Sequence, residues 1–452
     1  MTTDVGHTIT GLRRLDLRVA GDDDAVTTTR ARLVRRGAVP DDRIRASVRA
    51  LLAEVRTDPD IGVRAANDRF GGGLPDGRLL LDRTELARAR DALDPDTRLA
   101  LEDAIRNVRR FAETQRPAST TTETQPGVTI ERRWVPLDRV GCYVPGGAAA
   151  YPSTLVMTVV PARVAGVGAV VVASPAGPRG SVDTVLLGAA GLLEVDAFVV
   201  AGGAQAIGAL AFGLPGAGIP PVDRIVGPGN TWVTAAKLEL AGEVGIDMPA
   251  GPSEGLVLVD GSANPELAAA DLLTQAEHGP DSPAILVTSD PDVADAVEAA
   301  VLRQLAGAAR RDILERALAE QGWIVLATDL DAAVAFVNDY APEHLSIDVA
   351  DVETTVARIR NAGSVFVGRW SPESAGDYAT GANHVLPTGG LARASGALAV
   401  ESFGKYIQVQ RVSREGLAGL RSTIGTLATA EGLIAHRAAV EIRFGDGQTE
   451  RR

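Results

Sequence analysis

The sequence predicts an α/β protein with two halves, each built around a parallel sheet. From about residue 138, short apolar runs rich in β-branched residues alternate with alanine-rich stretches of helical periodicity, which is typical of parallel α/β units. The same alternation of strand-like and helical stretches continues on both sides of residues 248–252, which are rich in glycine and proline. This indicates two stacked halves. A chain of 452 residues is long enough for about three domains and a large core.

Residues 1–130 are predicted to form a mostly helical segment that packs on the core. Apolar residues recur at helical spacing in 41–55 and in 85–116, and Pro95 is expected to break the second of these helices. A threonine-rich patch then leads into 128–137, whose alternating pattern predicts an edge strand.

The two α/β halves are assigned to 131–250 and 251–384. The predicted strands are 169–173, 197–201, 224–226, 256–259, 285–288, 324–326 and 364–367. The predicted helices between them include 182–193, 231–240, 265–278 and 292–305. Residues 385–452 are irregular and then helical at 424–440; they are too few for a core of their own, so we expect this tail to pack on something else.

Composition excludes several classes of protein. The 45 basic and 58 acidic residues give a net charge of −13 without long single-sign blocks, which argues against a nucleic-acid partner. The single cysteine, Cys142, excludes an intramolecular disulfide and a four-thiolate zinc site. The longest uncharged run, 197–222, is interrupted by glycine and proline, and no signal-peptide pattern is visible, so we expect a cytoplasmic protein that does not insert into membranes.

The stretch Gln-Ala-Glu-His-Gly-Pro at 275–280 is the most informative local pattern. Asn264 and Pro265 fit the first turn of a helix, and the Gly-Pro pair ends it. Gln275 and His278 then lie three residues apart on one face, so they can converge on one ion or one substrate. The alternative is a helix-end imidazole near the C-terminal dipole, and the pattern alone is weak.

Other histidines also lie among polar groups. The chain has five histidines in all. Besides His278, His344 follows an acid, Glu343, directly. His384 lies a few residues after Asp377, and His436 lies after Glu431.

Three glycine-rich turns follow strand-like runs and are candidate phosphate sites. They lie at 145–147, 201–205 and 227–230, where backbone N–H groups before a helix can face an anion. None is Gly-x-Gly-x-x-Gly, and no acid stands at the spacing which that fingerprint requires. A standard dinucleotide fold is therefore not supported by these turns, and each could be an ordinary strand-to-helix connection.

A series of motifs follows in a fixed order along the chain. It comprises Val-Gly-Cys-Tyr-Val-Pro-Gly-Gly at 140–147, Ala-Tyr-Pro-Ser at 150–153, Gly-Pro-Gly-Asn at 227–230, Gly-Pro-Ser-Glu at 251–254, Gln-Ala-Glu-His at 275–278, Pro-Glu-His-Leu at 342–345, Gly-Asp-Tyr at 376–378, Asn-His-Val-Leu-Pro-Thr at 383–388, and Glu-Gly-Leu at 431–433 followed by His436. With these motifs the chain resembles the histidinol dehydrogenases over almost its whole length.

The resemblance implies both a fold and an activity. The fold has two incomplete Rossmann-like parallel-sheet domains and extended terminal segments that interlock a homodimer. The implied activity is the oxidation of L-histidinol to L-histidine through the aldehyde, the last step of L-histidine biosynthesis, with two NAD and one zinc per site.

The resemblance also implies a role for individual residues. The implied zinc ligands are Gln275, His278, Asp377 and, from the neighbouring subunit, His436. The implied substrate contacts are these four ligands together with Ser253, His344, His384 and Glu431, and the implied NAD contacts are Tyr143, Gln205 and Asn230. Imidazole and carboxylate are ordinary zinc donors, whereas an amide oxygen is weaker, so we expect an exchangeable, chelator-sensitive ion.

The adjacent pair Glu343 and His344 can supply the base and the water activation that such an oxidation needs. A neutral imidazole, with a pKa near ~6.5, can take the alcohol proton while hydride leaves. Glu343 would then activate the water that attacks the aldehyde. The alternative is an incidental polar couple at a helix N-terminus.

Some features leave other interpretations open. Cys142 has no arranged base, so we assign it to packing. The Gly- and Pro-rich segment 213–221 differs from the pattern expected for the family. Because it lies between two of the implied NAD contacts, the affinity for NAD is the property it puts in question. Rival functions are a zinc hydrolase, a binding-only relative, and a dehydrogenase of the same family that acts on another small polyol such as a sulfopropanediol.

Overall fold

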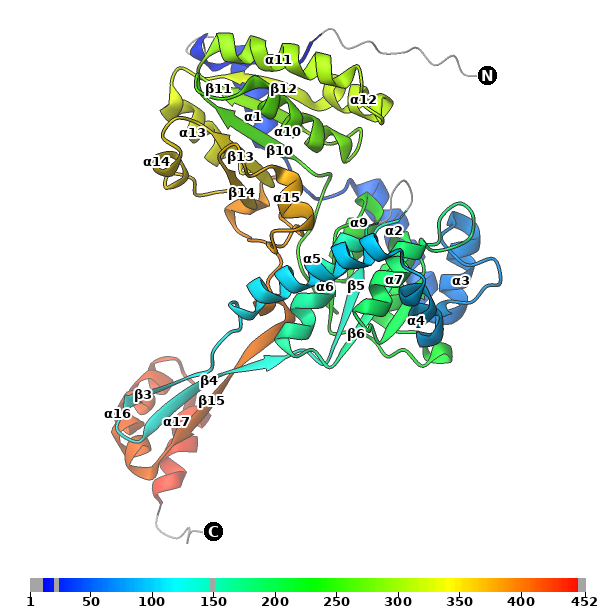
Figure 1. Cartoon of the computed structure of the whole chain (residues 1–452). Coiled ribbons are helices and arrows are strands. Elements are labelled where there is room, and N and C mark those ends of the chain that lie inside the picture. Colours follow the sequence, from blue (N-terminus) through cyan, green and yellow to red (C-terminus); the bar gives the residue numbers. More distant parts are fainter. Residues whose placement is uncertain (1–10, 20–23, 147–150, 446–452) are drawn as a thin grey trace. The chain divides into compact units, whose positions relative to one another are not determined.

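The computed structural model describes residues 11–19, 24–146 and 151–445 (Figure 1). These form two compact units. The described residues between 11 and 115 and between 137 and 403 form the main unit, and those between 116 and 136 and between 404 and 445 form the second unit.

The first sheet of the main unit has six strands in the order β2-β7-β6-β5-β8-β9, and all its pairs are parallel except β2 with β7. The strands are β2 (Leu80–Leu81), β5 (Arg139–Tyr143), β6 (Ala169–Ser174), β7 (Ala197–Val200), β8 (Arg224–Val226) and β9 (Gly245–Ile246). Its central strands are almost wholly buried, because helices cover both faces (Figure 1).

The helices on the two faces of this sheet belong to two different hydrophobic clusters. One cluster contains residues of α4 (Arg83–Asp91), α5 (Pro95–Glu113), α6 (Pro152–Ala165) and α7 (Thr184–Leu192). The other contains residues of α2 (Asp42–Thr57), α3 (Pro59–Phe70), α8 (Gly203–Phe212) and α9 (Thr231–Leu240). The N-terminal helices α2 to α5 therefore contribute to the core of the first half on both faces of its sheet.

The second sheet of the main unit is wholly parallel, in the order β1-β12-β11-β10-β13-β14. The strands are β1 (Arg13–Asp16), β10 (Gly255–Val259), β11 (Ala284–Thr288), β12 (Gly322–Leu326), β13 (His344–Asp348) and β14 (Ser364–Val367). One face is covered by α10 (Pro265–Glu277), α11 (Pro291–Leu305) and α12 (Arg311–Gln321). The other packs on α1 (Asp24–Val34), α13 (Leu330–Tyr340) and α14 (Val352–Val356).

Short elements complete the main unit beyond these two layers. They are α15 (Glu373–Tyr378) and the 3-10 turns η1 (Leu17–Val19), η2 (Pro215–Ala217), η3 (Leu391–Arg393) and η4 (Val400–Phe403). The predicted α/β class is confirmed, and each predicted strand and helix of the two halves is present within a few residues. Strands β5 and β13 were not among the predicted strands.

The second unit contains an antiparallel sheet in the order β15-β4-β3. Its elements are β3 (Thr120–Gln125), β4 (Val128–Pro136), β15 (Gly404–Val412), α16 (Arg414–Ala430), α17 (Ile434–Glu441) and η5 (Ile442–Phe444). The strand predicted at 128–137 is present as β4, but its predicted edge position is wrong: β4 is the middle strand, because β15 pairs with it from Gly404↔Pro136 to Val412↔Val128.

The helix predicted at 424–440 is also not continuous. It is divided into α16 and α17 at residues 431–433, where Gly432 has a left-handed φ of 72°. A side chain with a Cβ is strained at that φ, so glycine permits the break. Gly432 is itself a helix-stop signal in the sequence, and the prediction of one continuous helix overlooked it.

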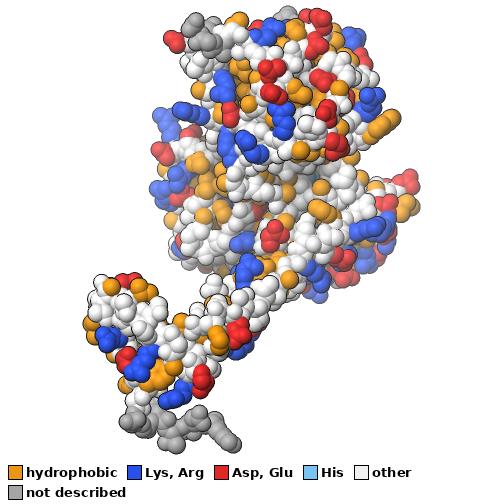
Figure 2. Space-filling model, turned by 90° about the vertical axis from the view of Figure 1, so that its left-hand side faces the viewer, with side chains coloured by type: hydrophobic (Ala, Val, Ile, Leu, Met, Phe, Trp, Pro, Cys, Tyr) orange, Lys and Arg blue, Asp and Glu red, His pale blue; other side chains and the backbone are white. Residues whose placement is uncertain are grey.

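The surface agrees with the charge pattern of the sequence. On the face that Figure 2 shows, basic and acidic side chains are interspersed rather than gathered by sign. No helix in the described part of the chain is long and apolar enough to span a bilayer.

Candidate active site

Helix α10 carries the first two candidate ligands. The Asn264 side chain accepts a hydrogen bond from the Glu266 N–H, Pro265 occupies the first turn, and His278 forms the C-cap, as the sequence predicted. Gln275 is buried against the first residue of β10, Gly255. A Cβ at Gly255 would lie 2.7 Å from the Gln275 side chain, so glycine makes room for this amide.

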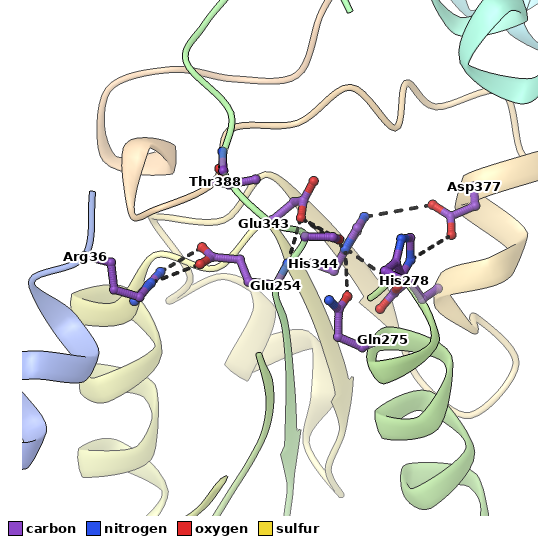
Figure 3. A network of polar contacts seen from close by, with 11 residues as sticks. Arg36, Glu254, Gln275, His278, Glu343, His344, Asp377 and Thr388 are labelled. Atoms are coloured by element: carbon purple, nitrogen blue, oxygen red, sulfur yellow. Dashed lines mark hydrogen bonds and ion pairs between the residues drawn. The ribbon is translucent and has the colours of Figure 1, made fainter. Parts of the chain in front are cut away.

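His278 lies beside two carboxylates of α15, those of Glu373 and of Asp377, the second of which is labelled in Figure 3. Its Nε2 is 3.3 Å from Glu373 Oε1 and 3.9 Å from Asp377 Oδ2. The potential ligand atoms of these three residues all lie within 4.8 Å of one another, so they could hold a metal ion. Sequence analysis missed Glu373, although its spacing of four from Asp377 on a helix places both on one face.

The charges in this cluster favour a cation. Burial would lower the pKa of His278, but the hydrogen bond and charge of Glu373, with the charges of Asp377 and Glu343, raise it to about 9. Burial raises the pKa of both Glu373 and Asp377. Three buried or half-buried carboxyl groups therefore surround one imidazole, an arrangement that a bound cation would stabilise.

His344 begins β13 and faces the same cluster. Its Nδ1 is 3.4 Å from Gln275 Oε1, and its Nε2 is 3.9 Å from Asp377 Oδ1 (Figure 3). His344 Nε2 and Gln275 Nε2 are buried and have no hydrogen-bond partner among the described residues. Burial lowers the pKa of His344 to about 4, so its imidazole is neutral at pH 7. The alternative of a helix N-terminus at this pair is wrong, because a strand starts here.

Glu343 is buried beside His344 and is held by the two residues that precede β10. Its Oε2 accepts hydrogen bonds from Ser253 Oγ at 2.8 Å and from the Glu254 N–H at 2.9 Å. Burial raises the pKa of Glu343 to about 8. Ser253, a candidate substrate contact, therefore lies next to the candidate base.

His384 connects this region to the first half of the main unit. Its Nδ1 is 2.9 Å from the Asp377 carbonyl oxygen, and its Nε2 is 3.2 Å from Thr154 Oγ1 on α6. Burial lowers the pKa of His384. The structure thus brings together six of the candidate residues, namely Ser253, Gln275, His278, His344, Asp377 and His384, with Glu343.

The candidate NAD residues follow the carboxyl ends of strands in the first sheet, where ligands bind in open α/β folds. Tyr143 ends β5, and its OH accepts a hydrogen bond from the Gly203 N–H at 3.3 Å. Gln205 lies in the first turn of α8 and donates to Asn67 Oδ1 at 3.3 Å. Asn230 caps α9 by accepting from two backbone N–H groups.

Glycines shape the turns around Tyr143. Gly227 has φ 114°, and a Cβ there would lie 2.1 Å from the Tyr143 carbonyl oxygen, so no other residue fits. Helix α8 begins at Gly203, whose N–H donates to the Tyr143 OH, and its N-cap residue, Gly202, has no side chain to cap the remaining N–H groups of the first turn, which are suited to an anion. Gly147 and Ala150 of the sequence motifs lie outside the described residues.

Two further expectations concern the first half. Cys142 is fully buried and burial raises its thiol pKa to about 12, which confirms a packing role over a nucleophilic one. The segment 213–221 forms a compact turn in which Leu214 pairs with Ile219 and the Gly216 N–H donates to Asp60. Its effect on cofactor affinity stays a prediction.

The remaining candidates belong to the second unit. Glu431 is the C-cap of α16, and His436 lies in the first turn of α17. Both side chains are exposed in the single chain.

Comparisons with known proteins agree with this geometry. The family model described as histidinol dehydrogenase matches residues 34–444. A histidinol dehydrogenase of Methanosarcina barkeri is 43% identical over 415 residues, covering 92% of this chain and 95% of that protein. One of Nocardia farcinica is 45% identical over 439 residues, covering 96% and 98%. The crystal structure of histidinol dehydrogenase from Elizabethkingia anophelis matches with a TM-score of 0.88 and 34% identity, covering 97% of this chain and 99% of that one. On these matches the chain belongs to the histidinol dehydrogenase family.

Proposed function

We propose that the protein is an NAD-dependent oxidoreductase that converts L-histidinol to L-histidine through the aldehyde, the last step of L-histidine biosynthesis. The observation that carries this proposal is the buried pair Glu343 and His344 beside the His278 and Asp377 cluster, in a chain of this family. A cytoplasmic location stays a prediction.

We propose zinc as the metal, held by Gln275, His278 and Asp377 of one chain and His436 of a second. The donor set fits, because an imidazole and a carboxylate already converge and the buried Gln275 amide lies next to them. Glu373 Oε1 lies 3.3 Å from the same His278 Nε2 that faces Asp377, so Glu373 would lie beside the ion as a further candidate ligand. When bound, zinc would polarise the alcohol oxygen and position the substrate.

His344 is the proposed base in the alcohol oxidation. The Gln275 Oε1 faces its Nδ1, which favours the tautomer with hydrogen on Nδ1 and leaves a lone pair on Nε2. That Nε2, which has no partner among the described residues, would take the hydroxyl proton as hydride leaves the adjacent carbon for NAD. The product of this step is the aldehyde.

Glu343 is the proposed base in the second stage. Its ionised carboxylate would remove a proton from water as the water oxygen attacks the aldehyde carbon, and the hydrate then loses its hydride to a second NAD. Hydrogen bonds from Ser253 and the Glu254 backbone hold the carboxylate at one orientation. Both donors are uncharged, so the carboxylate keeps its negative charge when it is ionised and can act as a base.

The pH dependence of the aldehyde stage follows from this role. Since the pKa of Glu343 is raised to about 8 and the ionised form is the base, the rate with L-histidinal should rise with pH and level off above about 8. The rise should approach about tenfold per pH unit on the acid side. Stopped-flow measurement of NADH formation checks this, with Glu343→Gln expected to lose the dependence together with most of the rate. A rate that is flat from about pH 6 to about pH 8 would contradict the assignment.

For NAD we propose contacts with Tyr143, Gln205 and Asn230. The uncapped N-terminus of α8 beside Tyr143 supports a site for the pyrophosphate. The amide oxygen of Asn230 already caps α9, so its NH2 group would be the part available to the cofactor.

We also propose a homodimer with shared active sites. The second unit has few buried side chains, and Leu427, Leu433, Ile434 and Ile442 are 43 to 67% exposed on it. Figure 2 shows hydrophobic side chains on its surface. Such an apolar surface on so small a unit is expected to be covered by a second chain. Glu431 and His436 would then reach the partner's substrate and zinc.

The proposal is tested by supplying the purified, zinc-loaded protein with NAD and either L-histidinol or a sulfopropanediol. Reduced cofactor should form with L-histidinol, and the family matches do not favour the polyol alternative. Selective turnover of the sulfopropanediol would reject the proposal. A chelated sample reloaded with zinc serves as the control for metal dependence.

A further inference from the structure

A buried ion pair lies next to the candidate catalytic residues but outside the proposed ligand and substrate contacts. Arg36 follows α1, and Glu254 immediately precedes β10. The Arg36 guanidinium donates two hydrogen bonds to the Glu254 carboxylate, Nη2 to Oε1 at 2.7 Å and Nε to Oε2 at 3.0 Å (Figure 3). The two side chains are 14% and 4% exposed. Such a two-bond contact fixes direction as well as distance.

Arg36 is itself held from several sides. Its guanidinium lies 3.3 Å from the centre of the Tyr340 ring and donates to the Tyr340 carbonyl oxygen at 3.0 Å. It also donates to the Leu33 carbonyl oxygen at 2.6 Å. Tyr340 ends α13, and Ala341 follows with a left-handed φ of 52° before the chain reaches Glu343. Arg36 therefore anchors the turn that leads into the catalytic pair.

Glu254 is anchored at its side chain and contacts the catalytic pair through its backbone. Its N–H donates to Glu343 Oε2 at 2.9 Å, and its carbonyl oxygen accepts from the His344 N–H at 3.1 Å. A shift of the Glu254 backbone would therefore move both the carboxylate and the strand start that carries the imidazole.

The cost of breaking the pair is large, because both charges are shielded from water. A buried carboxylate that loses its partner must recruit a proton, admit water or move its backbone. Of these responses, a backbone movement alters the hydrogen bonds that Glu254 makes to Glu343 and His344.

We propose that Arg36 is a positioning residue: through Glu254 and Tyr340 it fixes the Glu343 carboxylate and the His344 strand start in the geometry that both oxidation stages need. The inference rests on the proposed roles of Glu343 and His344. No direct contact of Arg36 with substrate or cofactor is involved.

The test is steady-state kinetics of Arg36→Met on L-histidinol. We expect kcat to fall about tenfold to a hundredfold, with KM for L-histidinol and NAD within about twofold of the parent, because geometry rather than binding is lost. Zinc content should be unchanged. Arg36→Lys keeps the charge but cannot make the two parallel bonds, so kcat should stay reduced while the melting temperature stays near that of the parent. Arg13→Met, which removes an arginine that lies over Trp323, is the matched control and should keep the parental kcat.

A double variant separates positioning from stability. Arg36→Met with Glu254→Gln removes the unpaired charge, so the melting temperature should recover toward the parental value while kcat stays low. Recovery of kcat together with the melting temperature would overturn the inference, as would a parental kcat in Arg36→Met or Arg36→Lys. If the parent oxidises L-histidinol and these variants do so with the parental kcat, this inference fails and the proposed function stands. A parent without that activity removes the proposed function and the inference with it.

Discussion

His344→Asn is expected to abolish oxidation of L-histidinol, whereas Glu343→Gln is expected to stall the reaction at the aldehyde. The loss in each affected stage should be about 10²–10⁴-fold, the usual effect of removing a general base. The two effects differ because the His344 Nε2 is the atom free to take the alcohol proton, while the Glu343 carboxylate is needed only when water attacks.

The two stages are measured separately by rapid mixing. Glu343→Gln with L-histidinol should give a first transfer to NAD at close to the parental rate and then little further NADH. His344→Asn should give no such first transfer. Formation of histidine from histidinol at the parental rate by Glu343→Gln would show that its assigned role is wrong. Zinc content, measured for both variants, must match the parent for the comparison to hold.

Mixing two inactive variants, His436→Asn and His278→Asn, is expected to restore activity if active sites are shared between subunits. In a mixed dimer one site would carry both lesions and the other none. Random reassortment should then approach about a quarter of the parental activity, for closed two-fold symmetry with independent sites. Activity is recorded after subunit exchange, with the proportion of mixed dimers verified by differently tagged chains.

The matched control mixes His278→Asn with Asp377→Asn. These residues lie 3.9 Å apart in one chain, so every site of that mixed dimer keeps one lesion and no recovery is expected. Absence of recovery in the first mixture, despite verified mixed dimers, would mean that His436 serves its own chain. The shared-site proposal would then be rejected.

The sequence predicted well what depends on local signals. The start and end of α10 are set by Asn264, Pro265 and the Gly-Pro pair, so its limits could be placed closely. Buried parallel strands such as β8 and β14 appear as short apolar runs, and their limits match the predicted ranges. The site residues came from matched motifs rather than from periodicity.

What the sequence could not predict depends on contacts between distant segments. The position of β4 in the middle of its sheet depends on pairing with β15, more than 260 residues later. Arg36 and Glu254 are 218 residues apart, and nothing near either of them indicates that they meet. Glu373 was missed for a similar reason, because its role follows from the approach of α15 to the end of α10.

The stoichiometry of cofactor reduction distinguishes a two-stage oxidation of L-histidinol from a single one. Limiting L-histidinol is incubated to completion with zinc-loaded protein and excess NAD, and NADH and L-histidine are both measured. An alcohol that becomes a carboxylic acid loses two hydrides, so the account predicts two NADH and one L-histidine for each L-histidinol consumed. One NADH per L-histidinol with accumulation of the aldehyde, or no NADH at all, would contradict it.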